Sequence, residues 1–378
     1  MEYRKFDKIA MDASLFGLGC MRFNGAPSGD SVIDEEKAIS LIRRAIDSGV
    51  NYLDTAFVYL DKTSEIVLGK ALLDGYRDRV TIATKMPIEH VSDYESMEAL
   101  LDLELKKLQT DHIDYYLMHG INKEKWLKFK EIGADKFFEE KKREGKIRYK
   151  CFSFHGPYED FEYIIQDYDW DMVQIQYNFM DIENQAGTKG LELAGKLGIP
   201  VVIMEGLLGG KLAKAPDSVQ ALYDAFPVKR SPVEWAFRWL GSHPQIMTIL
   251  SGCNEAEQID DNIRIFNDIQ ANCMTEEEWK LIDAVRDAYN ARTKIGCTGC
   301  RYCMPCPGGI DIPRVFAAWN EVALYGGDPA ENWNVMELKR LGQTPDKCLK
   351  CGKCEKACPQ YLKIMENLQI AWSELNPQ

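Results

Sequence analysis

The sequence lacks the features that mark membrane, exported and nucleic-acid-binding proteins. No apolar run approaches the ~20 residues that cross a bilayer, and the longest, residues 199–210, is interrupted by Glu205. The N-terminal stretch MEYRKFDKIAMD has no apolar core, so we expect no export leader and a cytoplasmic protein without a membrane partner. Basic residues are in deficit, with 46 Lys+Arg against 59 Asp+Glu and a net charge of −13. Because phosphate binding needs a basic footprint, nucleic acid is not expected as a partner.

Cysteine is plentiful and unevenly placed. Eight of the twelve cysteines follow residue 296, in the two runs CTGCRYCMPCP and CLKCGKCEKACP. In a cytoplasmic protein such runs indicate metal ligation rather than disulfides. The second run has the C-x₂-C-x₂-C-x₃-C-P spacing of bacterial-type ferredoxins, which it resembles, and the first run is one residue shorter before its last cysteine. The predicted metal ligands are Cys297, Cys300, Cys303, Cys306, Cys348, Cys351, Cys354 and Cys358.

Eight thiolates suit two [4Fe–4S] clusters. In two-cluster ferredoxins the fourth cysteine of each run binds the other cluster. That crossing would join Cys358 to the first triplet of cysteines and Cys306 to the second. Two Cys₄ zinc sites would use the same eight residues and remain the alternative. The third cysteine of each triplet and the proline after each run favour iron–sulfur.

Residues 14 to 268 alternate between short apolar runs and stretches with helical spacing, which predicts parallel strands joined by helices. The eight apolar runs are residues 15–20, 51–54, 79–85, 112–119, 146–154, 171–176, 199–205 and 245–252. Eight such units fit a closed (β/α)₈ barrel better than an open sheet. The predicted domains are a barrel over 1–272, a connector helix over 273–296 and a small, mainly helical iron–sulfur domain over 297–378.

Polar residues follow three of the predicted strands, at the end of a β/α barrel where chemistry occurs. They are Asp54 and Tyr59 after the second strand, Lys85 at the end of the third and His119 at the end of the fourth. The segments GVNYLDTAFVY, ATK and DYYLMH carry these residues in the order and spacing of the aldo-keto reductase family, which residues 2–268 resemble. The resemblance implies a barrel fold and a catalytic tetrad for hydride transfer to a carbonyl.

The chemistry of these four residue types fits that role. Reduction of a carbonyl needs an acid at the forming alkoxide, and tyrosine, with a reference pKa near 10, needs assistance. An ammonium at Lys85 would lower the pKa of Tyr59, and Asp54 would hold Lys85 by an ion pair. His119 would donate a hydrogen bond to the carbonyl oxygen. A Schiff-base lyase that uses Lys85 fits the same residues less well.

The resemblance also implies a nicotinamide cofactor. Family members hold its carboxamide with a Ser-Asn pair and a Gln; here Ser153 and Gln174 match, Phe154 replaces Asn, and His155 could supply a polar group. MEGLLGGKL resembles the pyrophosphate loop, and LSGCNEAEQIDDN resembles the adenosine segment. Because Glu255 replaces a usual Lys, NADH is expected to be preferred over NADPH. The remaining predicted contacts are Gly206, Leu208, Gly210, Ser251, Gly252, Gln258 and Asn262.

The leading hypothesis is therefore an NAD(P)-dependent oxidoreductase that acts on a small carbonyl or alcohol and carries two clusters for electron transfer or a structural role. An electron-carrier protein is a possible partner. The alternative is an electron-transfer or redox-sensing module whose barrel binds nucleotide but reduces carbonyls poorly, with Phe154 as its support. Substrate specificity is expected in the loops 22–33, 120–135 and 211–230, where Phe23, Trp126 and Phe226 suggest an apolar wall.

Overall fold

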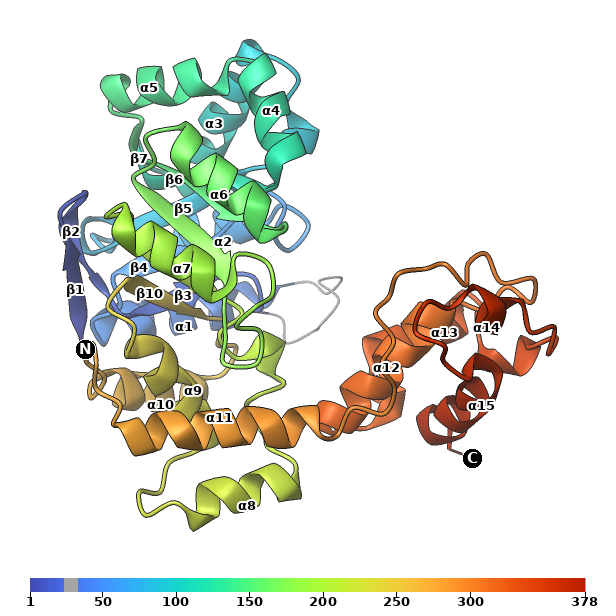
Figure 1. Ribbon diagram of the computed structural model, residues 1–378. Helices are drawn as coiled ribbons and strands as arrows, with labels where there is room; N and C mark the ends of the chain where they lie inside the picture. The colour runs from blue at the N-terminus through green and yellow to red at the C-terminus, as the bar shows by residue number, and fades with distance from the viewer. Residues whose placement is uncertain (24–32, 378) are drawn as a thin grey trace. The chain divides into compact units, whose positions relative to one another are not determined.

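The protein contains a closed barrel of eight parallel strands, as the sequence predicts (Figure 1). The computed structural model describes residues 1–23 and 33–377. Residues 24–32 of the predicted loop 22–33 therefore lie outside the described residues. Each strand pairs with the next along the chain, and the last closes the barrel on the first. The strands are β3 (Phe16–Gly19), β4 (Tyr52–Asp54), β5 (Thr81–Met86), β6 (Ile113–Ile121), β7 (Ile147–Phe154), β8 (Met172–Gln176), β9 (Val201–Met204) and β10 (Ile246–Ser251).

The strands are buried on both faces, which is why they read as apolar runs rather than as alternating ones. Amphipathic helices connect them: in α1, five apolar residues form the buried face, and Asp34 caps the first turn by accepting from the Lys37 amide. The helices of this unit are α1 (Glu35–Asp47), α2 (Ser64–Ala71), α3 (Tyr94–Leu108), α4 (Lys123–Glu131), α5 (Ala134–Glu144), α6 (Tyr158–Asp167), α7 (Gly187–Lys196), α9 (Pro232–Gly241) and α10 (Ala256–Phe266).

A hairpin precedes the barrel. Strands β1 (Tyr3–Phe6) and β2 (Ile9–Ser14) are antiparallel. Ile9 and Ala13 are buried in one apolar cluster with Tyr52 and Tyr115, which come from the first residues of β4 and β6. The hairpin therefore closes the barrel interior at the end where the strands begin.

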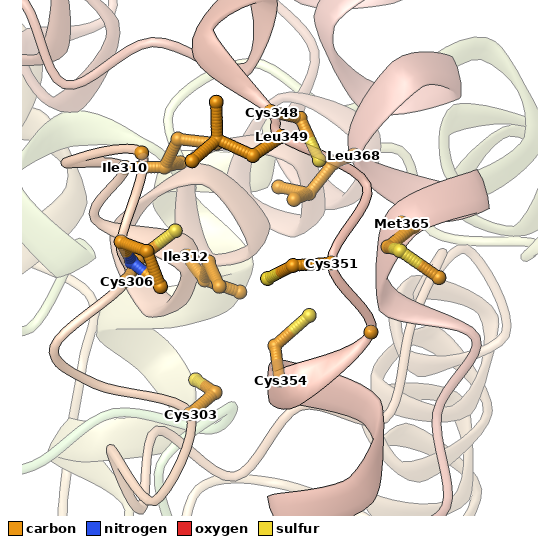
Figure 2. A pocket seen from close by; sticks show the side chains of 13 residues that line it. Cys303, Cys306, Ile310, Ile312, Cys348, Leu349, Cys351, Cys354, Met365 and Leu368 are labelled. Atoms are coloured by element: carbon orange, nitrogen blue, oxygen red, sulfur yellow. The ribbon is translucent and has the colours of Figure 1, made fainter.

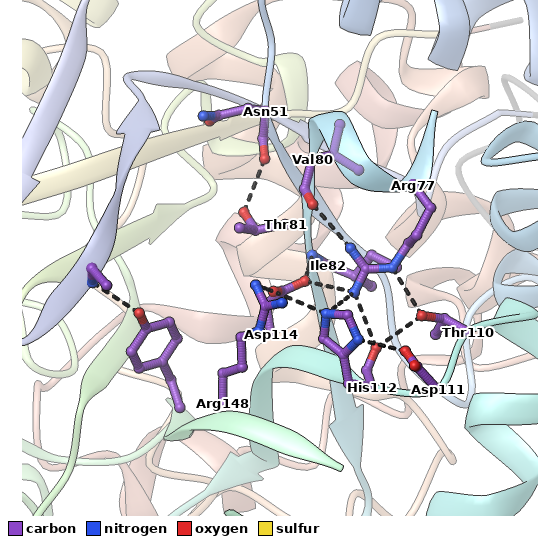
Figure 3. Close-up of polar contacts among 12 residues, drawn as sticks. Asn51, Arg77, Val80, Thr81, Ile82, Thr110, Asp111, His112, Asp114 and Arg148 are labelled. Carbon is purple, nitrogen blue, oxygen red and sulfur yellow. Dashed lines mark hydrogen bonds and ion pairs between the residues drawn. The ribbon is translucent and has the colours of Figure 1, made fainter. Parts of the chain in front are cut away.

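The Asp114 carboxylate is the centre of a polar network at the start of β6 (Figure 3). It is fully buried and accepts from Arg77 at 2.9 Å, from Arg148 at 2.8 Å and from the Ile82 amide at 2.9 Å. Two guanidinium groups and an amide satisfy the carboxylate, so this network links β6 to β5 and β7 and has a structural role. Catalytic residues of such barrels lie at the opposite ends of the strands.

A second compact unit comprises residues 210–232 and 276–378. It contains α8 (Asp217–Ala225), α11 (Glu276–Asn290), α12 (Ile312–Tyr325), α13 (Trp333–Arg340), α14 (Lys353–Ala357) and α15 (Ile364–Leu375). Its apolar core includes Phe316, Trp319 and Leu368, with cysteines of both runs packed against it. The C-terminal region is thus mainly helical, as predicted, whereas the boundaries 1–272, 273–296 and 297–378 remain a prediction.

The helix within the predicted connector segment 273–296 is α11, which spans only Glu276–Asn290. It ends at Asn290, and the amides of Lys294 and Ile295 both donate to the Asn320 side chain, which lies in α12. Asn320 in turn donates to the Ile295 carbonyl at 2.8 Å. A side chain distant in sequence thus satisfies the backbone just past the helix end.

Among the described residues, no helix combines the length and apolar character that crossing a bilayer requires.

Candidate functional site

The structure brings together the four residues of the predicted tetrad, which come from three neighbouring strand ends. Lys85 Nζ lies 2.6 Å from Asp54 Oδ1 and 3.5 Å from the Tyr59 hydroxyl. It also donates to the Thr55 carbonyl at 2.7 Å. The rings of Tyr59 and His119 meet edge to face, with their centroids 5.8 Å apart. One ammonium thus contacts a carboxylate and a phenol, and an imidazole lies beside that phenol.

Strand pairing explains this convergence. Asp54 ends β4 and Lys85 lies in β5, and these two strands are adjacent and parallel. Directly after Tyr59 the chain makes a left-handed turn of three non-glycine residues, Leu60, Asp61 and Lys62, with φ of 51°, 51° and 67°. Such residues cost about 1–3 kcal/mol each. The strained turn follows the one tyrosine whose hydroxyl lies beside Lys85 in this site.

The ammonium of Lys85 is held in its charged form. Burial alone would lower the pKa of Lys85, but Asp54 and Tyr59 outweigh burial and raise it. The pKa of Tyr59 is raised by burial, and Lys85 lowers it in part. Lys85 thus lowers the pKa of Tyr59, as the sequence predicts. The net shift is nevertheless upward, because the effect of desolvating the phenol is larger than the effect of the Lys85 charge. Tyr59 is thus a protonated phenol at neutral pH.

His119 is a neutral imidazole. Burial lowers its pKa to about 3, and the positive charge of Lys85 acts in the same direction. A neutral imidazole carries one N–H donor, and it can therefore donate a hydrogen bond without serving as the acid.

Two of the predicted nicotinamide contacts face the tetrad side of the barrel. Burial raises the pKa of Asp54, and Gln174 lies close enough to lower that pKa in part. Within the described residues, the Gln174 Oε1 atom is buried with no hydrogen-bond partner. A primary carboxamide would supply the missing donor, so the residues present fit a nicotinamide. The Ser153 hydroxyl accepts from the Gly120 amide at 2.7 Å and retains its own proton for donation.

The residues that follow Ser153 lie differently. Phe154 is fully buried and its ring contacts Phe161 of α6 with a centroid separation of 5.2 Å, so its side chain belongs to the packing between strand and helix. His155 is exposed, its Nδ1 lies 3.1 Å from Gln185 Oε1, and its charge affects the pKa of His119. His155 is therefore the polar neighbour of His119, and Phe154 is not.

The predicted pyrophosphate segment is a tight turn. Leu208 has φ of 49° within the 3₁₀ turn Leu208–Gly210, and a Cβ on Gly206 would lie 2.8 Å from the Leu240 side chain. Only glycine fits at that position without displacing Leu240. Sequence reasoning missed Arg22, whose Nη2 is 3.7 Å from an ideal Cβ on Gly209 and whose Cδ is 3.5 Å from one on Gly252. Arg22 thus joins the two segments predicted to contact the dinucleotide, and its place after β3 is the signal that could have identified it.

The predicted adenosine segment forms the start of α10. Asn262 donates to the Ser251 hydroxyl at 3.0 Å, and the Gln258 side chain accepts from the Asn254 amide at 2.9 Å. Glu255 precedes α10 and is paired with Lys37 at 2.6 Å, with side chains 51% and 41% exposed. Lys37 therefore offsets part of the negative charge that Glu255 would present to a ligand.

The eight C-terminal cysteines line two cavities of the second unit. The cysteines that line the cavity in Figure 2 are Cys306, Cys348, Cys351, Cys354 and Cys303. The cysteines that line the other cavity are Cys297, Cys300, Cys303 and Cys358. Each cavity thus receives the last cysteine of the other run, and Cys303 and Ile312 line both. Among the described residues, none of these cysteines forms a disulfide.

The donor set suits a cluster better than a single ion. Zinc binds thiolates at about 2.3 Å, which requires four sulfurs around one point. No group of three or more His, Cys, Asp or Glu side chains within residues 1–23 and 33–377 is spaced to hold one metal ion. The cysteines instead surround two cavities, each lined by at least four cysteines, which is the number of thiolates that a [4Fe–4S] cluster takes.

Comparison with known proteins gives two matches along the chain. Residues 16–287 match the aldo/keto reductase family, and residues 296–365 match the 4Fe-4S dicluster domain. A Bacillus subtilis protein named uncharacterized oxidoreductase YqkF is 28% identical over 77% of this chain and 99% of its own. The solved aldo-keto reductase AKR11C1 of Bacillus halodurans, in its holo form, is 25% identical with a TM-score of 0.63, covering 75% of this chain and 96% of its own. A Klebsiella pneumoniae aldo/keto reductase solved with NADP and acetate is 22% identical with a TM-score of 0.60, covering 75% of this chain and 95% of its own.

Proposed function

The chain belongs to the aldo/keto reductase family of oxidoreductases and carries a 4Fe-4S dicluster domain, and from this premise we propose that it transfers hydride between a nicotinamide cofactor and a small carbonyl or alcohol. One observation supports this most directly. The buried Lys85 ammonium contacts both Asp54 and the Tyr59 hydroxyl, beside a neutral His119. That arrangement provides a proton donor and a hydrogen-bond donor for one substrate oxygen.

Each residue of the tetrad has its own role in the proposed reaction. A bound reduced nicotinamide supplies the hydride that the carbonyl carbon accepts. Tyr59 gives its phenolic proton to the carbonyl oxygen, and the phenolate that remains faces Lys85 Nζ across 3.5 Å. Lys85 stabilises that phenolate, and Asp54 fixes the position of Lys85. His119 donates a hydrogen bond to the same oxygen and lowers the energy of the developing alkoxide. In the oxidative direction each proton moves in reverse.

The proposed dinucleotide contacts follow the strand ends. Ser153 and Gln174 would hold the carboxamide, with His155 as a further polar group, and Gly206, Leu208 and Gly210 would present backbone amides to the pyrophosphate. Arg22 would add a guanidinium between the two loops, which supports an anionic ligand there. Ser251, Gly252, Glu255, Gln258 and Asn262 would receive the adenosine end. We propose that the protein prefers NADH over NADPH, and we expect this preference to be modest because Lys37 offsets part of the Glu255 charge.

The second unit is proposed to hold two [4Fe–4S] clusters with crossed ligands. One would take Cys297, Cys300, Cys303 and Cys358; the other would take Cys348, Cys351, Cys354 and Cys306. The lining of the two cavities supports this assignment over one in which each run serves its own cluster. Such clusters exchange single electrons, whereas a nicotinamide exchanges a hydride, so an electron-carrier protein is the partner that would use them.

The alternative function, a redox module with a poorly active barrel, drew its support from Phe154. That side chain packs against Phe161, and a phenyl ring supplies no polar contact to a carboxamide, so experiment has to separate the alternative from the reductase. Rapid mixing of the protein with NADH distinguishes the two functions. Fast NADH oxidation by a panel of carbonyls supports the reductase, whereas cluster reduction without any carbonyl supports the redox module.

The substitution Tyr59→Phe tests the proposal. It removes the proton donor and keeps the ring, so carbonyl reduction should fall by roughly 10²–10⁴-fold while dinucleotide affinity stays close to that of the unmodified protein. Tyr158→Phe is the matched control, because the Tyr158 hydroxyl contacts only a Glu162 carboxylate at 3.2 Å among the bonds of the described residues. Full turnover in Tyr59→Phe would show that the acid is another group.

A further inference from the structure

The segment 210–232, which follows β9, packs with the cluster-bearing unit. Lys211 Nζ lies 3.2 Å from Glu321 Oε1 of α12. Arg292 donates to the Ser218 hydroxyl at 3.0 Å and to the Ala323 carbonyl of α12 at 2.7 Å. Two cationic side chains therefore join this segment to α12.

Helix α12 also forms a wall of both cysteine cavities. Ile312 lines the two cavities, and Phe316 lines the one that contains Cys358. Glu321 lies nine residues beyond Ile312 in the same helix, a distance of about 13 Å along the axis at 1.5 Å per residue. The Glu321 carboxylate is fixed by a second contact, because Asn332 donates to it at 3.0 Å. One continuous helix thus contacts the cavities at its first turns and the segment 210–232 at its last turns.

The chain passes directly from the proposed pyrophosphate turn into this segment. The turn Leu208–Gly210 ends at the residue before Lys211. We infer that Glu321 and Arg292 are positioning residues through which cluster ligation and dinucleotide binding strengthen each other. This inference rests on the proposed function and adds a coupling that neither the barrel nor the clusters require by themselves.

The physical basis is linkage between two binding events. Ligation of a cluster fixes the segments that supply its ligands, so it stabilises the elements packed around the cavities. If α12 is fixed, Lys211 and Ser218 are held, and less conformational entropy is lost when the turn before them closes on a ligand. Linkage is reciprocal, so a bound dinucleotide must oppose the local opening that exposes the clusters. The Lys211–Glu321 pair is 41% and 26% exposed, so by itself it adds little stability, and the coupling depends on both cationic contacts.

The test measures how fast an iron chelator removes the clusters from the full-length, cluster-loaded protein. NAD⁺ is the probe, because the oxidised dinucleotide occupies the site without reducing the clusters, and NADP⁺ is run in parallel. We expect saturating dinucleotide to slow the loss of visible absorbance by roughly fivefold, at the low end of measured couplings. In Glu321→Gln this factor should fall toward one, and Arg292→Gln should reduce it through a separate contact. Glu331→Gln, which alters an exposed carboxylate that forms no ion pair among the described residues, should keep the full factor.

Fluorescence titration of each dinucleotide accompanies the kinetics and separates the possible failures. If the unmodified protein binds NAD⁺ or NADP⁺ but loses its clusters at the same rate with and without them, the coupling is refuted and the reductase proposal is untouched. If it binds neither, the dinucleotide site is refuted and the coupling with it. Equal protection in Glu321→Gln, Arg292→Gln and the unmodified protein would refute the role of these two residues. Iron content and circular dichroism before the assay establish that each variant is folded and loaded.

Discussion

Replacing Lys85 by methionine should leave the buried Asp54 carboxylate without its ion-pair partner. Lys85 and Asp54 are joined at 2.6 Å with side chains 1% and 4% exposed. Methionine keeps most of the volume of lysine and removes its charge. Asp54 Oδ2 has no hydrogen-bond partner among the residues that the structure describes, so the loss of Lys85 leaves this carboxylate with little besides Gln174 nearby. The variant therefore isolates the energetic role of the ammonium within the barrel.

The size and the pH dependence of the effect follow from burial. Breaking a buried ion pair by removing one partner destabilises a protein by about 3–5 kcal/mol. Burial raises the pKa of Asp54 and Lys85 lowers it, so in the variant the folded-state pKa moves further above the unfolded value of about 3.9. A group with a raised folded-state pKa disfavours folding more as pH rises from the unfolded pKa through the folded pKa. The penalty should therefore be smaller at pH 5 than at pH 8, by about 1.4 kcal/mol per pH unit in that interval.

Thermal unfolding followed by far-ultraviolet circular dichroism, with visible absorbance to report the clusters separately, measures this penalty. At roughly 2–4 °C per kcal/mol for a large domain, Lys85→Met should lower Tm at pH 8 by on the order of 10 °C. The double variant Lys85→Met/Asp54→Asn should recover most of that loss. Lys128→Met, which removes an exposed pair with Glu124, should change Tm little. An unchanged Tm at pH 8, or a loss that is equal at both pH values and persists in the double variant, would refute the reasoning.

Four further predictions concern the site and the clusters. Because burial lowers the pKa of His119 to about 3, kcat/KM for carbonyl reduction should be constant between about pH 5 and 8; an inflection near pH 6.5 that His119→Gln abolishes would contradict this. Glu255→Lys should shift the kcat/KM ratio toward NADPH by removing a carboxylate near the 2′-phosphate, and an unchanged ratio would place Glu255 elsewhere. Anaerobic protein should hold about eight irons and eight sulfides, and zinc without sulfide would refute that. Cys306→Ala should alter the electron paramagnetic resonance signal that Cys348→Ala alters; a change matching Cys297→Ala instead would show uncrossed ligands.

The sequence predicts most of the barrel because the information is local. Each strand is a short apolar run bounded by a turn, and each helix has its own periodicity, so all eight strands could be located without knowledge of their neighbours. The tetrad was predictable for a related reason: residues that end adjacent parallel strands must converge. The roles of these residues remain predictions, but their proximity did not require the structure.

What the sequence does not reveal depends on contacts between distant segments. Arg22 reaches Gly252 only because β10 pairs with β3 and closes the barrel. Trp126, suggested as part of a substrate wall, is instead fully buried, with its ring 5.2 Å from that of Trp170 and its Nε1 donating to Asp167. The net rise in the pKa of Tyr59 could not be predicted either, because it depends on how deeply the phenol is buried and the spacing of residues does not give that depth.

The placement of Cys358 beside Cys297, Cys300 and Cys303 has a consequence for biosynthesis. Neither cavity contains four cysteines until both runs have left the ribosome, and at ~5–20 residues per second the second run emerges seconds after the first. During that interval, a scaffold that delivers a preformed cluster would meet only three of the four cysteines that line the cavity of Cys358. With the crossed ligands proposed above, cluster insertion would follow translation of both runs, when α12, whose Ile312 lines both cavities, has already been synthesised.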